Sequence, residues 1–453
     1  ADPETLVVVT GQQPGLFGGR LYALSKAVAA ARWAAELEAA GRPAVAVFWV
    51  ATEDHDFAEV AHGTFLTHEG LLDVGLGDDP DPLLPVGMRS FGPAVEACLE
   101  QLREAIPGDR FGAWTETLGR WYRPAARFGE AFPRLLVHLL GERAPLMLDA
   151  QLPALKRAEV PWMERLVRER HALDQALTAS EDRIRSYGFD LQVAPQPGVS
   201  PLFLLRGGER RRIEWIGESH YRLRGLDEER PVDELYDVLR DNPGVLSPGV
   251  LARPALQDAV LGSALQVLGP GELSYMVQAA AVHGFLGLDG PATSLRPQTL
   301  VLEERHLEWI EDLGLGLEDL LGDRRELDQR LAEAAGVDFV TPVKEQIATL
   351  LDGLRGPVTE VDANLAKPLE RTRDHAIGAL EQLAAKLAAA AARTDEVRRR
   401  RVDTLRELCL PHGSLQERVL STSYFPGKYG ETLVEALWRQ MELDGRHLQV
   451  IRL

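Results

Sequence analysis

Apolar and polar positions at the start of the chain follow the order of strand, turn and helix that is typical of α/β proteins. Residues 6–10 form a short β-branched run that ends at Gly11, and residues 21 to about 40 are alanine-rich and helical. Residues 44–50 are a continuous apolar run of strand length, which is typical of a strand covered on both faces in a parallel sheet. Two βα units are therefore predicted.

The middle of the chain alternates helical and strand patterns. Alternating runs such as residues 202–205 and 211–215 predict small antiparallel strands inserted between core elements. From Gly249 a doubly wound pattern resumes. The other predicted elements are helices between about residues 93 and 140, a buried strand at 145–149, one long helix from about 155 to 187, a strand at Val250–Leu251, a helix from Ala255, a strand at 264–268 and a helix beginning near Glu272.

After about residue 303 the strand signals give way to long stretches rich in Arg, Glu, Ala and Leu. Apolar residues keep three- and four-residue spacing from Val343 to Leu365 and again from Ile377 to Ala391, which predicts an antiparallel helical arm. Its turn is expected near 362–368, because Asp and Asn there can cap a helix and Pro is tolerated only in a first turn. The apolar seam predicts pairing within the arm and homodimerisation.

The predicted organisation is an α/β core interrupted by a small subdomain and followed by the arm. The helix after the turn is expected to run to Leu410, and the tail is expected to return to the core with a last strand at 448–453. The predicted parts are core, first part with a helical insertion, 1–189; connecting subdomain, 190–248; core, second part, 249–302; helical arm, 303–410; and C-terminal return, 411–453.

Length and charge narrow the class of protein. The chain has 453 residues, enough for a well-buried core, and a formal net charge of −19, which disfavours nucleic acid and anionic membranes as partners. Cys98 and Cys409 lack metal-ligand or redox spacing, and no apolar run is long enough for a membrane span or resembles a signal peptide. We therefore expect a cytoplasmic enzyme.

Candidate chemistry begins at the first turn, Thr10-Gly11-Gln12-Gln13-Pro14-Gly15, which joins the first strand to the first helix. Its glycines let the backbone approach a ligand, and the helix N-terminus offers N–H groups to a phosphate or carboxylate. The turn matches neither the P-loop nor the dinucleotide fingerprint. The alternative is a tight turn in which the two glutamines cap the helix.

Four ionisable residues, Glu53, Asp54, His55 and Asp56, follow the second strand. In an extended backbone Glu53 and His55 would share one face, and the two aspartates the other. His55 could act as a general base whose tautomer a neighbour fixes, or the group could hold a divalent metal together with His62. The alternative is a helix start with acidic capping residues. We predict no tightly bound metal.

Two further strand-to-helix junctions add polar groups to the same predicted sheet edge. Arg253 suits bidentate capture of a carboxylate or phosphate, although each residue at these junctions could also have a purely structural partner. Four such junctions on one edge favour a common pocket. The candidate residues are Arg253, Gln257 and Asp258 at the first junction, and Gly269, Gly271, Glu272 and Tyr275 at the second.

Five ordered motifs, which span essentially the whole chain, resemble the bacillithiol biosynthesis cysteine-adding enzyme family, a family of cysteine ligases. The motifs are Thr10-Gly-Gln-Gln-Pro-Gly-Leu-Phe17, Phe48-Trp-Val-Ala-Thr-Glu-Asp-His-Asp-Phe57, Arg253-Pro-Ala-Leu-Gln-Asp258, Gly269-Pro-Gly-Glu-Leu-Ser-Tyr275 and Gln416-Glu-Arg-Val419.

The resemblance implies a Rossmann-like core with connecting-peptide insertions and a long coiled-coil arm that mediates dimerisation. It implies a reaction that joins the cysteine carboxylate to the amine of glucosaminyl malate, with ATP and Mg²⁺ as the activating pair. In that reaction Gly11 to Gln13 would hold a carboxylate or phosphate, His55 or Asp54 would accept the amine proton, and Arg253 would orient malate or the activated acyl group. Two alternatives remain open at this stage: a metal-dependent amide hydrolase built on Glu53–Asp56 and His62, and a non-catalytic scaffold that senses a metabolite.

Overall fold

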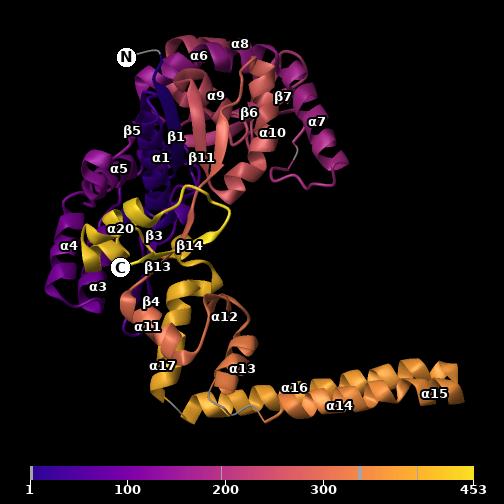
Figure 1. Ribbon diagram of the computed structural model, residues 1–453. Helices are drawn as coiled ribbons and strands as arrows, with labels where there is room; N and C mark the ends of the chain where they lie inside the picture. The colour runs from indigo at the N-terminus through magenta and orange to yellow at the C-terminus, as the bar shows by residue number, and fades with distance from the viewer. Residues whose placement is uncertain (1–3, 195, 335–338, 395) are drawn as a thin grey trace. The chain divides into compact units, whose positions relative to one another are not determined.

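The structure is a computed structural model that describes residues 4–194, 196–334, 339–394 and 396–453 (Figure 1). The chain divides into two compact units. One contains Ala1–Leu300 with Glu417–Ile451, and the other contains Val301–Gln416 with Arg452–Leu453.

A five-stranded parallel sheet is the centre of the first unit. Its strand order is β12 (Ala292–Leu295), β11 (Ser263–Leu268), β1 (Leu6–Gln12), β2 (Ala44–Val50) and β5 (Leu146–Asp149). All neighbouring pairs are parallel. The chain leaves β1 toward β2 on one side and later returns to β11 on the other, so the winding reverses between β1 and β11. Open α/β sheets bind ligands at such a switch point. The predicted doubly wound core is confirmed.

Helices cover this sheet on both faces, which explains why its interior strand β2 is a continuous apolar run. Side chains alternate along β2: Trp49 clusters with Leu155 of α6 (Pro153–Arg168), whereas Phe48 contacts Phe132 of α5 (Phe128–Leu140). The predicted first helix is present as α1 (Tyr22–Ala39), which packs along β1 and β2. Figure 1 shows α1 running alongside these strands.

Two predictions about the middle of the chain are wrong. The single helix at 155–187 is two helices, α6 and α7 (Arg170–Ser186), because Glu169 leaves the helical region at φ −103° and ψ 27°. The strand at Val250–Leu251 is a turn. The carbonyl of Gly249 accepts hydrogen bonds from the amides of the third and fourth residues after it, which leads the chain directly into α9 (Arg253–Leu261).

A second sheet is antiparallel and confirms the small strands predicted between core elements. Its order is β10 (Leu246–Pro248), β6 (Val199–Arg206), β7 (Glu209–Ile216), β8 (His220–Leu223) and β9 (Glu229–Pro231). Its apolar side packs with helices α6, α8 (Asp233–Asp241) and α10 (Pro270–Leu286) in one core cluster.

The rest of the first unit is mostly helical, as predicted for residues 93–140. The tail also returns to this unit, and its last strand is present as β14, which pairs with β13. These remaining elements are α2 (Phe57–Val60), β3 (His62–Thr67), β4 (Gly70–Gly75), α3 (Ala94–Ala105), α4 (Asp109–Gly119), β13 (Gln298–Leu302), α18 (Gln416–Val419), α19 (Tyr424–Tyr429), α20 (Thr432–Gln440) and β14 (Leu448–Arg452).

Apart from the ends of β13 and β14, the described elements of the second unit are helices. Helices α14 (Thr341–Gly353) and α15 (Arg355–Val361) pack against the long α16 (Ala366–Thr394), with a turn at 362–365 in which Asp362 caps by accepting from the Asn364 amide. The predicted turn is confirmed. The predicted helix to Leu410 is present as α16 and α17, and residue 395 between them lies outside the described residues. The unit also contains α11 (Glu304–Leu313), α12 (Leu317–Leu321), α13 (Arg324–Ala334) and α17 (Glu396–Cys409).

In the parts of the chain that the structure describes, no helix combines the length and the apolar character that a membrane crossing requires.

Candidate active site

A cavity of about 550 Å³ lies at the carboxyl ends of β1, β2 and β11. It is therefore placed where the sheet's winding reverses. All of its wall residues belong to the first unit. The predicted site residues in its wall are Gly11, Gln12, Gln13, Glu53, Asp54, His55, Arg253, Gly269, Gly271, Glu272 and Tyr275.

Five predicted site residues lie outside the wall, each with a structural contact. The Thr10 hydroxyl donates to the Val267 carbonyl at 2.8 Å and ties β1 to β11, and Gly15 packs closely on the backbone of another glycine. The Asp56 carboxylate caps α2. Gln257 is buried, and Asp258 accepts hydrogen bonds from a glutamine and a histidine in the core.

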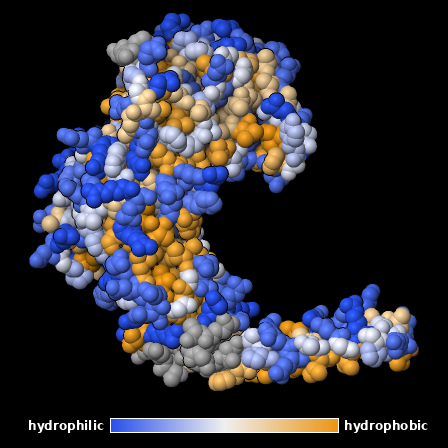
Figure 2. Space-filling model, in the orientation of Figure 1, coloured by the Kyte–Doolittle hydropathy of each residue, from blue (hydrophilic) through white to orange (hydrophobic). Residues whose placement is uncertain are grey.

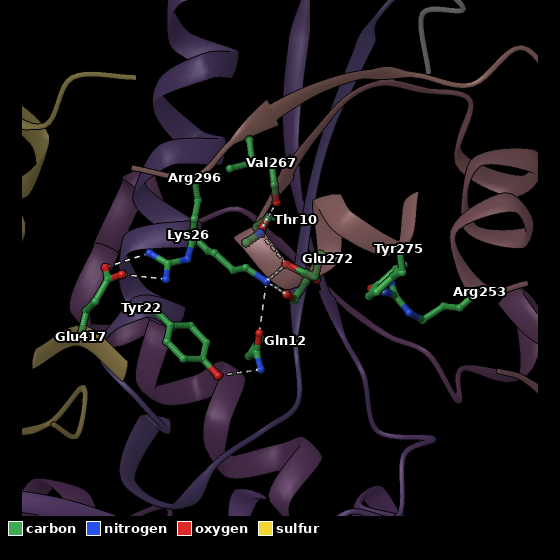
Figure 3. A network of polar contacts seen from close by, with 12 residues as sticks. Thr10, Gln12, Tyr22, Lys26, Arg253, Val267, Glu272, Tyr275, Arg296 and Glu417 are labelled. Carbon is green, nitrogen blue, oxygen red and sulfur yellow. Dashed lines mark hydrogen bonds and ion pairs between the residues drawn. The ribbon is translucent and has the colours of Figure 1, made fainter. Parts of the chain in front are cut away.

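The turn after β1 differs from the predicted anion site at a helix N-terminus. A single 3-10 turn at Leu16–Gly18 separates it from α1, and neither glutamine caps that helix. The neighbour of the turn is instead Lys26, whose ammonium donates to the Gly11 carbonyl at 2.7 Å and to Gln12 Oε1 at 3.1 Å (Figure 3). Gln13 donates to Asp54 at 3.0 Å, so the turn is bonded to the residues after β2.

Lys26 also forms an ion pair with Glu272 at the start of α10. Burial lowers the pKa of Lys26, although Glu272 opposes that shift. Burial raises the pKa of Glu272, but Lys26 and Arg253 outweigh it, so its pKa lies below the ordinary value and the group is a carboxylate. Lys26 was not predicted as a site residue. Its signal in the sequence is a lysine within the otherwise uncharged stretch from Ala23 to Ala31, which α1 buries.

The prediction that Glu53–Asp56 alternate between two faces is wrong, because β2 ends at Val50 and the following residues form a turn. Glu53 turns inward and pairs with the buried Lys156, while Asp54 and His55 both reach Arg210. Burial raises the pKa of Glu53 despite the nearby ammonium. For His55, burial and then the charge of Arg210 lower the pKa, so its imidazole is neutral at physiological pH.

The same geometry bears on the metal-dependent alternative. The Glu53 carboxylate is already engaged by Lys156, and His62 lies in the wall of a second hollow of about 650 Å³, together with Asp56 and with His55, which lines both hollows. Among the residues with described positions, no group of three or more His, Cys, Asp or Glu side chains is arranged to hold a metal ion.

Arg210 on β7 is a second wall residue that was not predicted. It is 4% exposed, and its guanidinium donates to Ser247 Oγ and to the Pro248 carbonyl, both at 2.9 Å. Its guanidinium carbon lies 3.9 Å from the centre of the Phe203 ring. The alternation of β7 places Arg210 and Arg212 on one face, and both line the cavity. In the sequence, the three consecutive arginines do not distinguish this face from a solvated one.

The wall carries an excess of positive charge. It contains seven Arg or Lys side chains and four carboxylates, a formal charge of +3 in a chain of −19. Arg253 is half-buried, and its guanidinium donates to two neutral groups, the Tyr275 hydroxyl at 2.7 Å and Gln257 Oε1 at 3.5 Å. Figure 3 shows Arg253 beside Tyr275, apart from the Arg296–Glu417 pair. Such a cavity suits an anion with carboxylate or phosphate groups.

Two glycines of the wall give a matched test of how tightly the turn is built. A methyl group at Gly11 would lie 2.9 Å from the Trp49 carbonyl oxygen, whereas one at Gly271 would meet nothing within 4 Å. We expect Gly11→Ala to lower the free energy of unfolding by about 1–3 kcal/mol and Gly271→Ala, in the first turn of a helix, to leave it unchanged or raise it by up to about 1 kcal/mol. Urea denaturation of both variants checks this, and equal effects would contradict it.

Comparison with known proteins covers the whole chain. Residues 1–297 match the family described as Bacillithiol biosynthesis BshC, N-terminal Rossmann-like domain, and residues 299–453 match its C-terminal coiled-coil domain. A relative from Salinibacter ruber, named "Putative cysteine ligase BshC", is 31% identical over 99% of this chain and 83% of its own length. A relative of the same name from Thermus thermophilus is 32% identical over 96% of this chain and 87% of its own.

A solved structure of Mycobacterium tuberculosis methionyl-tRNA synthetase in complex with methionyl-adenylate is 10% identical and covers 90% of this chain and 89% of that chain, with a TM-score of 0.26. So low a TM-score carries no argument about fold or function. The two family matches together cover both units, and they agree with the parallel-sheet core and the helical arm described above. The chain belongs to the bacillithiol biosynthesis BshC family of cysteine ligases.

Proposed function

We propose that this ligase joins the carboxylate of L-cysteine to the amine of glucosaminyl malate, the last step of bacillithiol biosynthesis, and that the reaction occurs in the cationic cavity. Malate contributes carboxylates to the acceptor, and the other substrate is itself a carboxylate. The names of the relatives support a cysteine ligase. The choice of acceptor is supported by the charge of the cavity.

The observation that carries this proposal is the state of Arg253. A guanidinium withdrawn from water normally pairs with a carboxylate or another anion. The hydrogen bonds of Arg253 go to a neutral phenol and a neutral amide, and Glu272, a carboxylate that its charge stabilises, is ion-paired with Lys26, so N–H donors of the guanidinium are left for a ligand. We assign Arg253 to a carboxylate of malate or to the activated acyl group.

The cavity residues also fit ATP, whose phosphates need cations. Arg20, Arg296 and Arg418 lie in the wall, Arg296 over the Tyr22 ring, and Arg210 and Arg212 line it near Phe203. ATP with Mg²⁺ would supply activation of the cysteine carboxylate, which does not react with an amine unaided. The chain's own residues hold the carboxylates and exclude water.

Amide formation requires one proton to leave the amine. The nitrogen lone pair attacks the activated carboxyl carbon, the C–N bond forms and the C–O bond to the leaving group breaks. Asp54 or His55 accepts the proton, because both line the cavity at the end of β2. Gln13 orients Asp54 through its hydrogen bond of 3.0 Å.

Binding of the acceptor tests this assignment. Isothermal titration should show glucosaminyl malate binding at least about tenfold more tightly than glucosamine, since the malate carboxylates gain charge-assisted hydrogen bonds. The preference should shrink in Arg253→Met. Equal affinities of the wild-type protein for both compounds would contradict the proposed acceptor.

We further propose that the protein works in the cytoplasm as a homodimer through its helical arm. Leu350 of α14 is 70% exposed and Val361 of α15 is 82% exposed. Figure 2 shows hydrophobic residues along an edge of the arm formed by α14, α15 and α16. A second copy would cover them. Sedimentation velocity should give a dimer, and Leu350→Glu with Val361→Glu should give a monomer; a wild-type monomer would exclude the proposal.

A further inference from the structure

We infer that Arg210 fixes His55 in the neutral tautomer that carries its proton on Nε2, so that His55 serves the reaction as a hydrogen-bond donor and Asp54 is left as the base. The inference rests on the proposed function for its catalytic consequence. The tautomer itself rests only on the contacts of the two side chains.

The contact that decides the tautomer joins Arg210 Nη1 and His55 Nδ1 at 3.1 Å. A guanidinium has five N–H donors and no acceptor, and it stays protonated in proteins. His55 Nδ1 must therefore accept with its lone pair. The single proton of a neutral imidazole then lies on Nε2, which has no hydrogen-bond partner among the residues that the structure describes.

Arg210 cannot easily release this contact. Its Nε donates to Ser247 Oγ and its Nη2 to the Pro248 carbonyl of the neighbouring strand β10, and its guanidinium carbon lies 3.9 Å from the centre of the Phe203 ring. Its Nη1 also reaches Asp54 Oδ1 at 3.5 Å. These contacts come from the antiparallel sheet, whereas His55 follows β2 of the parallel sheet. The inserted sheet therefore supplies the residue that positions a side chain of the core.

The groups that face His55 keep its ring neutral as well as oriented. Burial comes first in lowering its pKa, and Arg210 and Arg89 add to that effect, while Asp54 and Asp56 oppose it. Phe203 lies 6.2 Å away, centroid to centroid. A neutral ring with Nε2–H donates one hydrogen bond and has no free lone pair.

This arrangement is the reverse of a histidine base. A histidine that acts as a general base donates Nδ1–H to a carboxylate or carbonyl and keeps the Nε2 lone pair for the substrate proton. Here an arginine stands in the place of that acceptor. His55 can instead donate to the carbonyl oxygen of the acyl group or to the leaving oxygen as negative charge develops there. The amine proton goes to the Asp54 carboxylate.

Nuclear magnetic resonance of the full chain labelled with ¹⁵N in its histidine rings tests the tautomer without any assay of activity. The signals missing from His55→Gln identify His55. At pH 7.5 we expect a protonated Nε2 and an unprotonated Nδ1, and in Arg210→Met we expect that preference to be lost and the pKa of the ring to rise. A protonated Nδ1 in the wild-type protein, or an unchanged ring in Arg210→Met, would overturn the inference.

Substitutions of His55 test the catalytic role. The amide nitrogen of glutamine takes nearly the place of Nε2–H, so product formation by His55→Gln should stay within about tenfold of the wild-type rate, whereas His55→Ala should lose roughly 100- to 1000-fold. If His55 acted as the base, both variants would lose product formation to the same extent, because neither glutamine nor alanine can accept the proton. That result would overturn the donor role. If the wild-type protein forms no product, the proposed function fails, and the resonance experiment still decides the tautomer.

Discussion

Replacing Lys156 by methionine is expected to lower the free energy of unfolding by about 3–5 kcal/mol at pH 8. Its ammonium is 1% exposed and lies between two buried carboxylates, bonding Glu159 at 2.9 Å and contacting Glu53. Methionine fills a similar volume and removes the charge, which leaves two carboxylates without a counter-ion. The loss also frees the turn that carries Asp54 and His55, so product formation should fall with stability.

The size of this effect depends on pH in a defined direction. Burial raises the pKa of Glu159 to about 7, above its ordinary value, so its contribution to stability is full at low pH and is lost as pH rises toward 7. Without Lys156 the pKa values of both carboxyls rise further. The variant should therefore differ less from the wild-type protein at pH 5 than at pH 8.

The chain offers a matched control in Lys344, which forms an exposed pair with Glu381 at 3.5 Å. Lys344→Met should change the free energy of unfolding by less than about 1 kcal/mol. Urea denaturation at both pH values, followed by tryptophan fluorescence, provides the comparison. A Lys156→Met variant as stable as the control at pH 8 would show that the buried network does not support the site.

Replacing Arg253 by methionine is expected to reduce product formation by roughly 100-fold or more while leaving the fold intact. Its hydrogen-bond partners, Tyr275 and Gln257, are neutral. Removing Arg253 therefore breaks no hydrogen bond to a carboxylate. The apolar part of methionine retains much of the packing of the arginine stem. A loss of activity without a matching loss of stability is the signature of a ligand contact.

Arg439 is the control for Arg253. Its side chain is 78% exposed and forms a long ion pair, with 3.8 Å between Arg439 Nε and Glu435 Oε2. Its helix, α20, contributes no residue to the cavity wall. Arg439→Met should retain wild-type activity and thermal stability. If Arg253→Met also retained wild-type activity, the cationic cavity would not be the place where the anionic substrates bind.

Although the short edge strand β12, half of whose residues are polar, was missed, sequence patterns located β1, β2, β5 and β11 because each holds a mostly apolar run. They also located the first turn and the residues after β2, since polar groups at the carboxyl ends of parallel strands converge. Arg253, Glu272 and Tyr275 were placed at the same edge by this reasoning, and all three lie in the cavity wall.

The residues that sequence reasoning missed share a physical cause. Lys26 and Arg210 reach the site through tertiary contacts with segments distant in the chain, Glu272 for the first and His55 for the second. Local spacing carries no information about such pairs. The break at Glu169 is of the same kind, because no glycine or proline marks it and the buried Arg170 is held by the Glu218 carbonyl.

The central claim is that the purified protein makes an amide from cysteine and glucosaminyl malate. The most direct test is mass spectrometry of the product formed from these two compounds, with ATP and Mg²⁺ both present and both withheld. We predict bacillithiol in the complete mixture and none without ATP. No product in either mixture would contradict the ligase proposed here and would favour a non-catalytic scaffold that binds the same metabolites.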